Sequence, residues 1–120
     1  MGLSCKMVTF DCADARALSA FWAKATGGTV AHDFDGWFVI LSTPALGVGA
    51  LGFQCVPEPK AAKNRCHLDL AAEDRRAEVA RLVALGATQG EEHSGGPFTW
   101  TRMEDPEGNE FCIADELAAE

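Results

Sequence analysis

The stretch "RCHLDLAAEDRRAEVARLVALGA", residues 65–87, contains a strand, a helix start, a helix and a helix stop in succession. In its first part polar and apolar residues alternate, which predicts a strand with one face in a core. His67 and Asp69 share the face opposite the apolar residues. Asp74 can accept a backbone N–H of the first helical turn and so predicts the helix start. Apolar residues at helical spacing follow, and Gly86 supplies the stop.

The same order of signals appears once earlier in the chain. Met7 and His67 lie 60 residues apart, as do Asp14 and Asp74. Met7 and Thr9 share the polar face of the first strand. Three strand-like segments follow each predicted helix, at residues 29–34, 37–43 and 50–56 and at residues 87–93, 98–104 and 110–115. The sequence therefore predicts a repeated unit of strand, helix and three strands, unless two α+β stretches resemble each other by chance.

The composition is that of one globular domain. The chain has 120 residues, 48% of them hydrophobic, and a formal net charge of −8. This length suffices for a single core. We therefore expect one domain over residues 1–120, with a first module at about 5–57 and a second at about 64–116.

Charge and hydropathy exclude several classes of partner. The acidic chain repels phosphates and its Lys and Arg residues do not cluster, which argues against nucleic acid. No apolar run reaches the roughly 20 residues of a membrane span, and the N-terminus lacks the pattern of a signal peptide. We therefore expect a cytoplasmic protein with neither a membrane nor a nucleic-acid partner. An odd number of cysteines without CxxC spacing favours reduced thiols packed as small core residues; these are Cys5, Cys12, Cys55, Cys66 and Cys112.

Three segments together resemble a known superfamily. They are "MVTFDCAD", "NRCHLDLAAEDRRAEVARLVALGA" and "DPEGNEFCI", the last of which begins with Pro and Gly placed for a tight turn. The sequence resembles the small glyoxalase-like and bleomycin-resistance-like members of the vicinal oxygen chelate (VOC) superfamily over nearly its whole length. The resemblance implies an α+β fold in which two βαβββ modules form an incomplete barrel around a cleft. It also implies a homodimer and, in active members, a divalent metal.

The resemblance places the family's ligand positions on four residues: Met7, Gln54, His67 and Cys112. This set departs from the usual His and Glu ligands, because a hard divalent metal prefers imidazole and charged oxygen donors. We therefore expect no cofactor and no catalytic residue. The alternative is a divalent metal at His67 with Gln54 or Cys112, with Asp69 one step along the strand.

Aromatic residues suggest a different use of the cleft. Trp37 and Trp100 lie on the two predicted third strands and could stack on a planar ligand; the alternative is that their rings fill the core. Arg102 shares a strand face with Trp100 and could orient an anionic ligand or pair with a surface carboxylate. The candidate ligand-binding residues are therefore Met7, Thr9, Trp37, Gln54, His67, Asp69, Trp100, Arg102 and Cys112.

Three functions follow from this interpretation. The first is metal-independent binding of a planar or apolar small molecule in a Trp-lined cleft, for sequestration or sensing as in the bleomycin-resistance branch. The second is an enzyme with a divergent metal site centred on His67: a glyoxalase-type lyase, an isomerase or a ring-cleaving dioxygenase of the superfamily. The third is a structural or regulatory module without a ligand.

Overall fold

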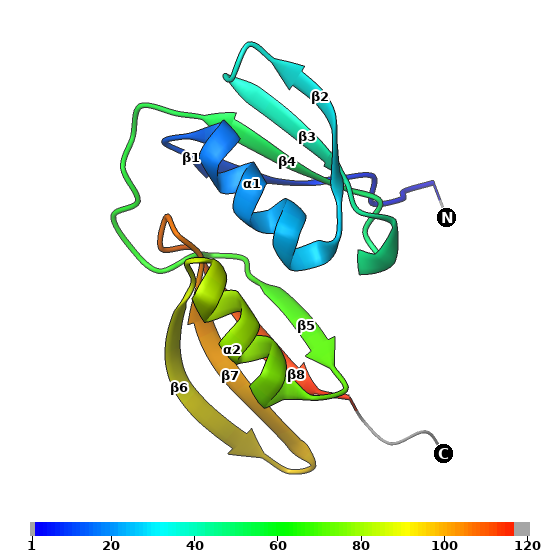
Figure 1. The fold of residues 1–120 in the computed structure, drawn as a ribbon, viewed down its shortest axis with the longest axis vertical. Coiled ribbons are helices and arrows are strands. Elements are labelled where there is room, and N and C mark those ends of the chain that lie inside the picture. Colours follow the sequence, from blue (N-terminus) through cyan, green and yellow to red (C-terminus); the bar gives the residue numbers. More distant parts are fainter. Residues whose placement is uncertain (1, 117–120) are drawn as a thin grey trace. The chain divides into compact units, whose positions relative to one another are not determined.

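The computed structural model describes residues 2–116, so residues 1 and 117–120 of the expected domain lie outside it. The chain divides into two compact units, Met1–Lys60 and Ala61–Glu120, each with one four-stranded sheet and one α-helix (Figure 1). This is the α+β fold of two βαβββ modules that the sequence predicts.

Unit 1 contains a sheet in the order β1-β4-β3-β2. The outer strand β1 is parallel to β4, and the other neighbours are antiparallel. Its elements are β1 (Val8–Cys12), α1 (Ala15–Thr26), β2 (Thr29–Phe34), β3 (Phe38–Ser42), a short 3-10 helix η1 (Pro44–Leu46) and β4 (Ala50–Cys55).

Unit 2 repeats this topology in the order β5-β8-β7-β6, with β5 parallel to β8. Its elements are β5 (Leu68–Ala72), α2 (Arg75–Leu85), β6 (Thr88–Gly95), β7 (Phe98–Glu104) and β8 (Glu110–Asp115). The predicted strands at 29–34, 98–104 and 110–115 are confirmed, and the bounds of the other three predicted segments shift by one or two residues.

Both helices begin where the sequence places their caps. The Asp14 carboxylate accepts the backbone N–H of Ala17 at 3.0 Å, and Asp74 accepts that of Ala77 at 3.1 Å. At the end of α1 Gly27 adopts φ 74°, a left-handed conformation that costs glycine little. These local signals start each helix at the same point of the repeat.

The core of unit 1 is aromatic. Trp22 of α1 and Phe53 of β4 are fully buried, and the Phe10 ring stacks on both, with centroids 5.5 and 5.4 Å away. Trp22 therefore lies in the core of unit 1. This packing covers one face of the sheet, and α1 leaves the other face open.

The core of unit 2 contains a charge. Leu82 and Val79 of α2 are buried, and Arg75, the first residue of this helix, is only 7% exposed. Its guanidinium donates to the Thr101 hydroxyl at 2.7 Å and contacts the carboxylates of Glu92 at 2.7 Å and Asp115 at 3.2 Å. The buried cation is therefore neutralised by two half-exposed acids.

The cysteines are mostly not core residues, contrary to expectation. Only Cys12 is buried, Cys55 and Cys112 are half-buried, and Cys5 and Cys66 are exposed. Within residues 2–116 no disulfide joins any of them.

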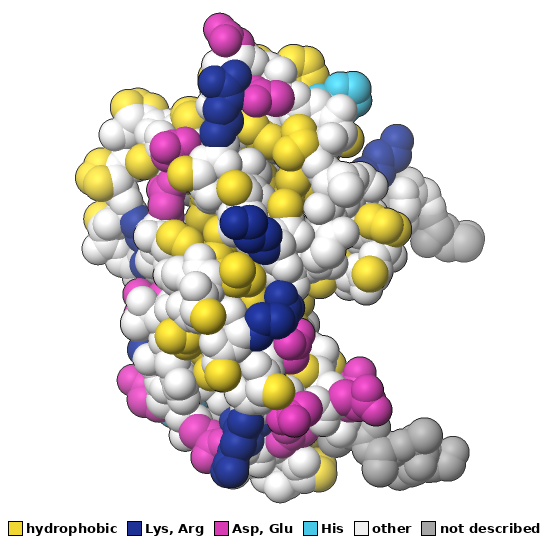
Figure 2. All heavy atoms as spheres, in the orientation of Figure 1, with side chains coloured by type: hydrophobic (Ala, Val, Ile, Leu, Met, Phe, Trp, Pro, Cys, Tyr) yellow, Lys and Arg dark blue, Asp and Glu magenta, His cyan; other side chains and the backbone are white. Residues whose placement is uncertain are grey.

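The surface agrees with the charge pattern of the sequence. On the face that Figure 2 shows, Lys and Arg side chains stand apart from one another among apolar and acidic ones. No helix within residues 2–116 is long and apolar enough to cross a membrane.

Candidate functional site

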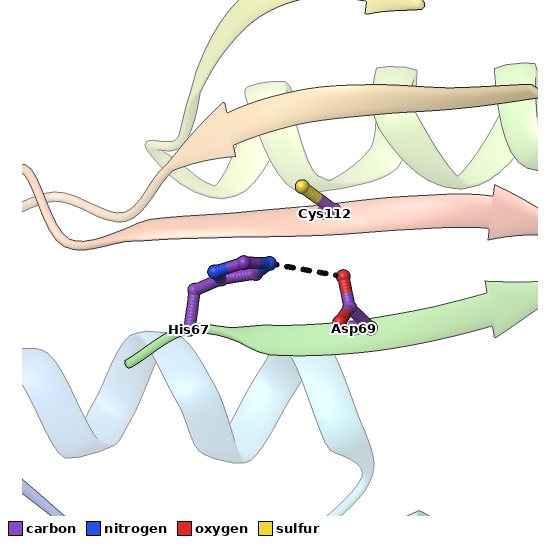
Figure 3. Close-up of side chains that lie close together, drawn as sticks. All are labelled: His67, Asp69 and Cys112. Carbon is purple, nitrogen blue, oxygen red and sulfur yellow. Dashed lines mark ion pairs between the residues drawn. The ribbon is translucent and has the colours of Figure 1, made fainter. Parts of the chain in front are cut away.

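The open face of the unit 2 sheet brings together three predicted residues (Figure 3). His67 lies directly before β5, Asp69 lies within it, and Cys112 is the register partner of Asp69 on β8. His67 Nε2 is 3.2 Å from an Asp69 carboxylate oxygen, and one ligand atom from each residue lies within 4.8 Å of the others. Nitrogen, oxygen and sulfur donors thus converge on one point of the sheet.

This donor set decides which metal would suit the site. Imidazole, carboxylate and thiolate are the ligands of tetrahedral zinc, whereas magnesium and manganese prefer oxygen throughout. Burial, and secondarily the charge of Asp69, raises the pKa of the Cys112 thiol, so a metal must displace its proton. The three residues therefore fit zinc and do not fit a hard divalent ion. Bound zinc would supply a Lewis acid at this face.

Arg102 is engaged by neighbouring carboxylates. Its guanidinium contacts Glu91 at 2.8 Å and Glu104 at 3.1 Å. The hydrogen bond from Arg102 lowers the pKa of Glu91 to about 2, with the backbone hydrogen bond as a smaller cause. Of the two predicted roles for Arg102, the structure places it with surface acids, so an anionic ligand would have to displace one of them.

An aromatic patch lies on the open face of the unit 1 sheet. We define the patch as His32, Phe34, Trp37 and Phe38. His32 stacks on Phe34 with centroids 5.8 Å apart, and Phe38 lies 5.8 Å from the Trp37 ring and 6.2 Å from that of Phe34. Phe34 is 45% exposed and Trp37 is 58% exposed. The patch therefore offers ring faces to solvent on the sheet face that α1 leaves open.

The register changes how the two tryptophans compare. Trp37 lies in the turn before β3, whereas Trp100 lies within β7. Phe38 pairs with Gln54 and Trp100 pairs with Ala114, so Phe38 is the counterpart of Trp100 in the repeat. Trp100 is half-buried and stacks on His93 at 5.6 Å. The predicted equivalence of Trp37 and Trp100 is wrong, because the β6–β7 hairpin is longer than its counterpart.

Gly52 occupies the position of unit 1 that matches Cys112. Its register partner is Thr9, the counterpart of Asp69. A Cβ on Gly52 would lie 2.8 Å from Thr9 Oγ1, 3.0 Å from Met7 Sδ and 3.2 Å from the Phe38 ring. The predicted residues Met7 and Thr9 thus meet over this glycine. Gln54 lies exposed on the same face, two residues further along β4.

Sequence reasoning missed most of the aromatic patch. In "HDFDGWF", residues 32–38, His32 and Phe34 alternate toward one face, and Asp35-Gly36 turns the chain so that Phe38 pairs with Phe34. The predicted strands at 29–34 and 37–43 imply a connection between them, but the pairing that gathers the rings depends on the register across it.

The topology and the open sheet faces define the class of paired βαβββ proteins. The glyoxalase-like domain family matches residues 7–114, and the chain belongs to that family, within the VOC superfamily. No curated protein matches the chain.

Solved structures agree on the fold. A glyoxalase/bleomycin resistance protein/dioxygenase family enzyme from Burkholderia phytofirmans PsJN aligns with a TM-score of 0.78 at 21% identity, covering 96% of this chain and 100% of that one. Lactoylglutathione lyase from Agrobacterium tumefaciens gives a TM-score of 0.70 at 16% identity, covering 96% and 95%. TioX from Micromonospora sp. ML1 gives 0.66 at 17% identity, covering 96% and 100%. At these identities the likeness concerns the fold.

Proposed function

We propose that the protein binds a planar or apolar small molecule without a metal, for sequestration or sensing in the manner of the bleomycin-resistance branch. The observation that carries this proposal is the aromatic patch, where two half-exposed rings stand on an open sheet face. Stacking of a flat ligand on exposed aromatic rings is favourable, because it buries their apolar surface. We further propose that the chain acts as one cytoplasmic domain and as a homodimer.

The site residues support this function in different ways. Trp37 and Phe34 would stack on the ligand, while Met7, Thr9 and Gln54 would line the same face of unit 1. In unit 2 we assign ligand contacts to His67, Asp69, Trp100, Arg102 and Cys112. The departure of Met7, Gln54 and Cys112 from hard metal ligands favours binding over metal catalysis.

The test is calorimetric titration of the full chain with a panel of planar aromatic compounds. For any compound that binds, Trp37→Ala and Phe34→Ala should each weaken affinity by about tenfold, because a stacking surface is lost. Phe98→Ala is the matched control, since Phe98 is similarly exposed at 48% but lies outside the patch. Equal affinities for the wild type and both patch variants would contradict the proposal. Binding of none of the compounds would favour a module without a ligand.

A second candidate function rests on the cluster of His67, Asp69 and Cys112. If these donors hold a metal, the chain would be a lyase, isomerase or ring-cleaving dioxygenase with a divergent site. Elemental analysis after incubation with Zn should then give stoichiometric metal that His67→Ala abolishes. His93→Ala, which removes an exposed imidazole elsewhere on unit 2, is the control. This result would overturn the metal-free proposal.

A further inference from the structure

Two cysteines in unit 1 are direct neighbours across the sheet. Cys12 is the last residue of β1, Cys55 is the last residue of β4, and the two are register partners in a parallel pair. Parallel neighbours lie about 4.8 Å apart, which is within the range of about 4.4–6.8 Å that a disulfide allows between Cα atoms. The Cα atoms of the two residues therefore already lie at a separation that a disulfide allows.

The thiols also lie on the same side of this sheet. Phe10 and Phe53, two residues before each cysteine, stack beneath α1, and side chains two residues apart share a face. Cys12 Sγ lies 3.4 Å from the Gln54 carbonyl oxygen, and Cys55 Sγ lies 3.6 Å from that of Ala13. Each sulfur thus reaches toward the backbone beside the other cysteine.

We propose that Cys12 and Cys55 are a modification site at which a small disulfide, such as oxidised glutathione, forms a reversible intrachain disulfide. Cys55 is the entry point, because it is half-buried whereas Cys12 is 4% exposed. The Cys55 thiolate attacks one sulfur of the small disulfide, whose S–S bond breaks and releases one thiolate. The Cys12 thiolate then attacks Cys55 Sγ and releases the second thiolate. The two cysteines lose two protons and two electrons, and the small disulfide becomes two thiols.

The location determines which parts of unit 1 the bond would join. It would join the strand that precedes α1 to the strand that precedes the connection to unit 2. Cys55 Sγ also donates to the Gly36 carbonyl at 3.2 Å, so the site adjoins the turn that carries Trp37. Parallel Cβ vectors must approach by about 1 Å to bond, and such strain makes a disulfide easier to reduce. The site is therefore suited to reversible oxidation.

Unit 2 cannot form this bond. The matching pair at the ends of β5 and β8 is Ala72 and Asp115. There the Asp115 carboxylate accepts a hydrogen bond from Arg75, so an ion pair ties the strand end to the helix. The dithiol is thus a feature of unit 1 and not of the repeat.

The test uses the full wild-type chain incubated with oxidised glutathione, acid-quenched, alkylated under denaturing conditions and mapped by mass spectrometry. We expect the peptides of Cys12 and Cys55 to lose alkylation together and to appear joined, without retained glutathione, and dithiothreitol to restore alkylation. In Cys12→Ser, Cys55 should instead retain glutathione, since no internal thiol can displace it. Alkylation of Cys12 after oxidation of the wild type, or linkage of Cys55 to a different cysteine, would overturn the proposal.

Discussion

The two units share one backbone plan and differ in what they present on their open faces. Unit 1 carries the aromatic patch, with Met7 and Thr9 closing over Gly52. Unit 2 carries the pair of His67 and Asp69, and the ion pairs that Arg102 makes with neighbouring carboxylates. The shared plan needs only alternation, caps and turns, so the side chains on the open face are those that can diverge without loss of the fold.

The faces beneath the helices differ as well. Trp22 and Leu82 follow their caps by the same number of residues, and both are buried. Ala15 and Arg75 also correspond, but one is a methyl group in an apolar core and the other a buried cation. Unit 1 is therefore held by apolar packing, and unit 2 partly by a network of charges.

The largest expected effect comes from emptying the aromatic core. Trp22→Ala should lower the free energy of unfolding by about 3–5 kcal/mol, because it removes a ring that packs on Phe10 and Phe21. Leu82→Ala in unit 2 should cost about 2–4 kcal/mol. Urea unfolding followed by circular dichroism compares the two. An equal or larger cost for Leu82→Ala would break the distinction between the cores.

An intermediate effect comes from the buried cation. Arg75→Met should lower the free energy of unfolding by about 2 kcal/mol; the cost stays below that of a fully buried pair because Glu92 and Asp115 are half exposed and water can solvate them. Arg16→Met, which breaks the solvent-exposed pair with Asp33, should leave unfolding unchanged within error. Thermal unfolding of both variants measures the difference. Equal stabilities would show that the Arg75 network contributes nothing to unit 2.

The smallest effect concerns the charges on the open face of unit 2. Arg102→Gln should return the pKa of Glu91 from about 2 toward its ordinary value of 4.5. Because the folded pKa is lowered, the pairing stabilises the fold above pH 4.5 and this contribution is lost as the pH falls from 4.5 to about 2. A carboxyl NMR titration measures the shift. Arg81→Gln, which breaks the separate pair with Glu78, should leave Glu91 unchanged; a Glu91 pKa that stays low in Arg102→Gln would contradict this assignment.

Local interactions explain why so much of the fold could be predicted. The Asp14 and Asp74 caps, the left-handed Gly27 and the turn after Asp105 all depend on contacts within four residues. In that turn the Asp105 carboxylate accepts the backbone N–H groups of Glu107 and Asn109. Such hydrogen bonds leave a signature in consecutive residues. Alternation likewise placed His67 and Asp69 on one face.

The sequence by itself therefore determined the two βαβββ modules, the caps at which their helices begin, and the shared face of His67 and Asp69. Only the tertiary structure decided that Thr9 pairs with Gly52, that four aromatic rings gather at the β2–β3 hairpin, and that Arg75 enters a core. These features depend on register and burial between strands far apart in the chain, where no run of neighbouring residues specifies the partner. The same non-local pairing places Cys12 beside Cys55.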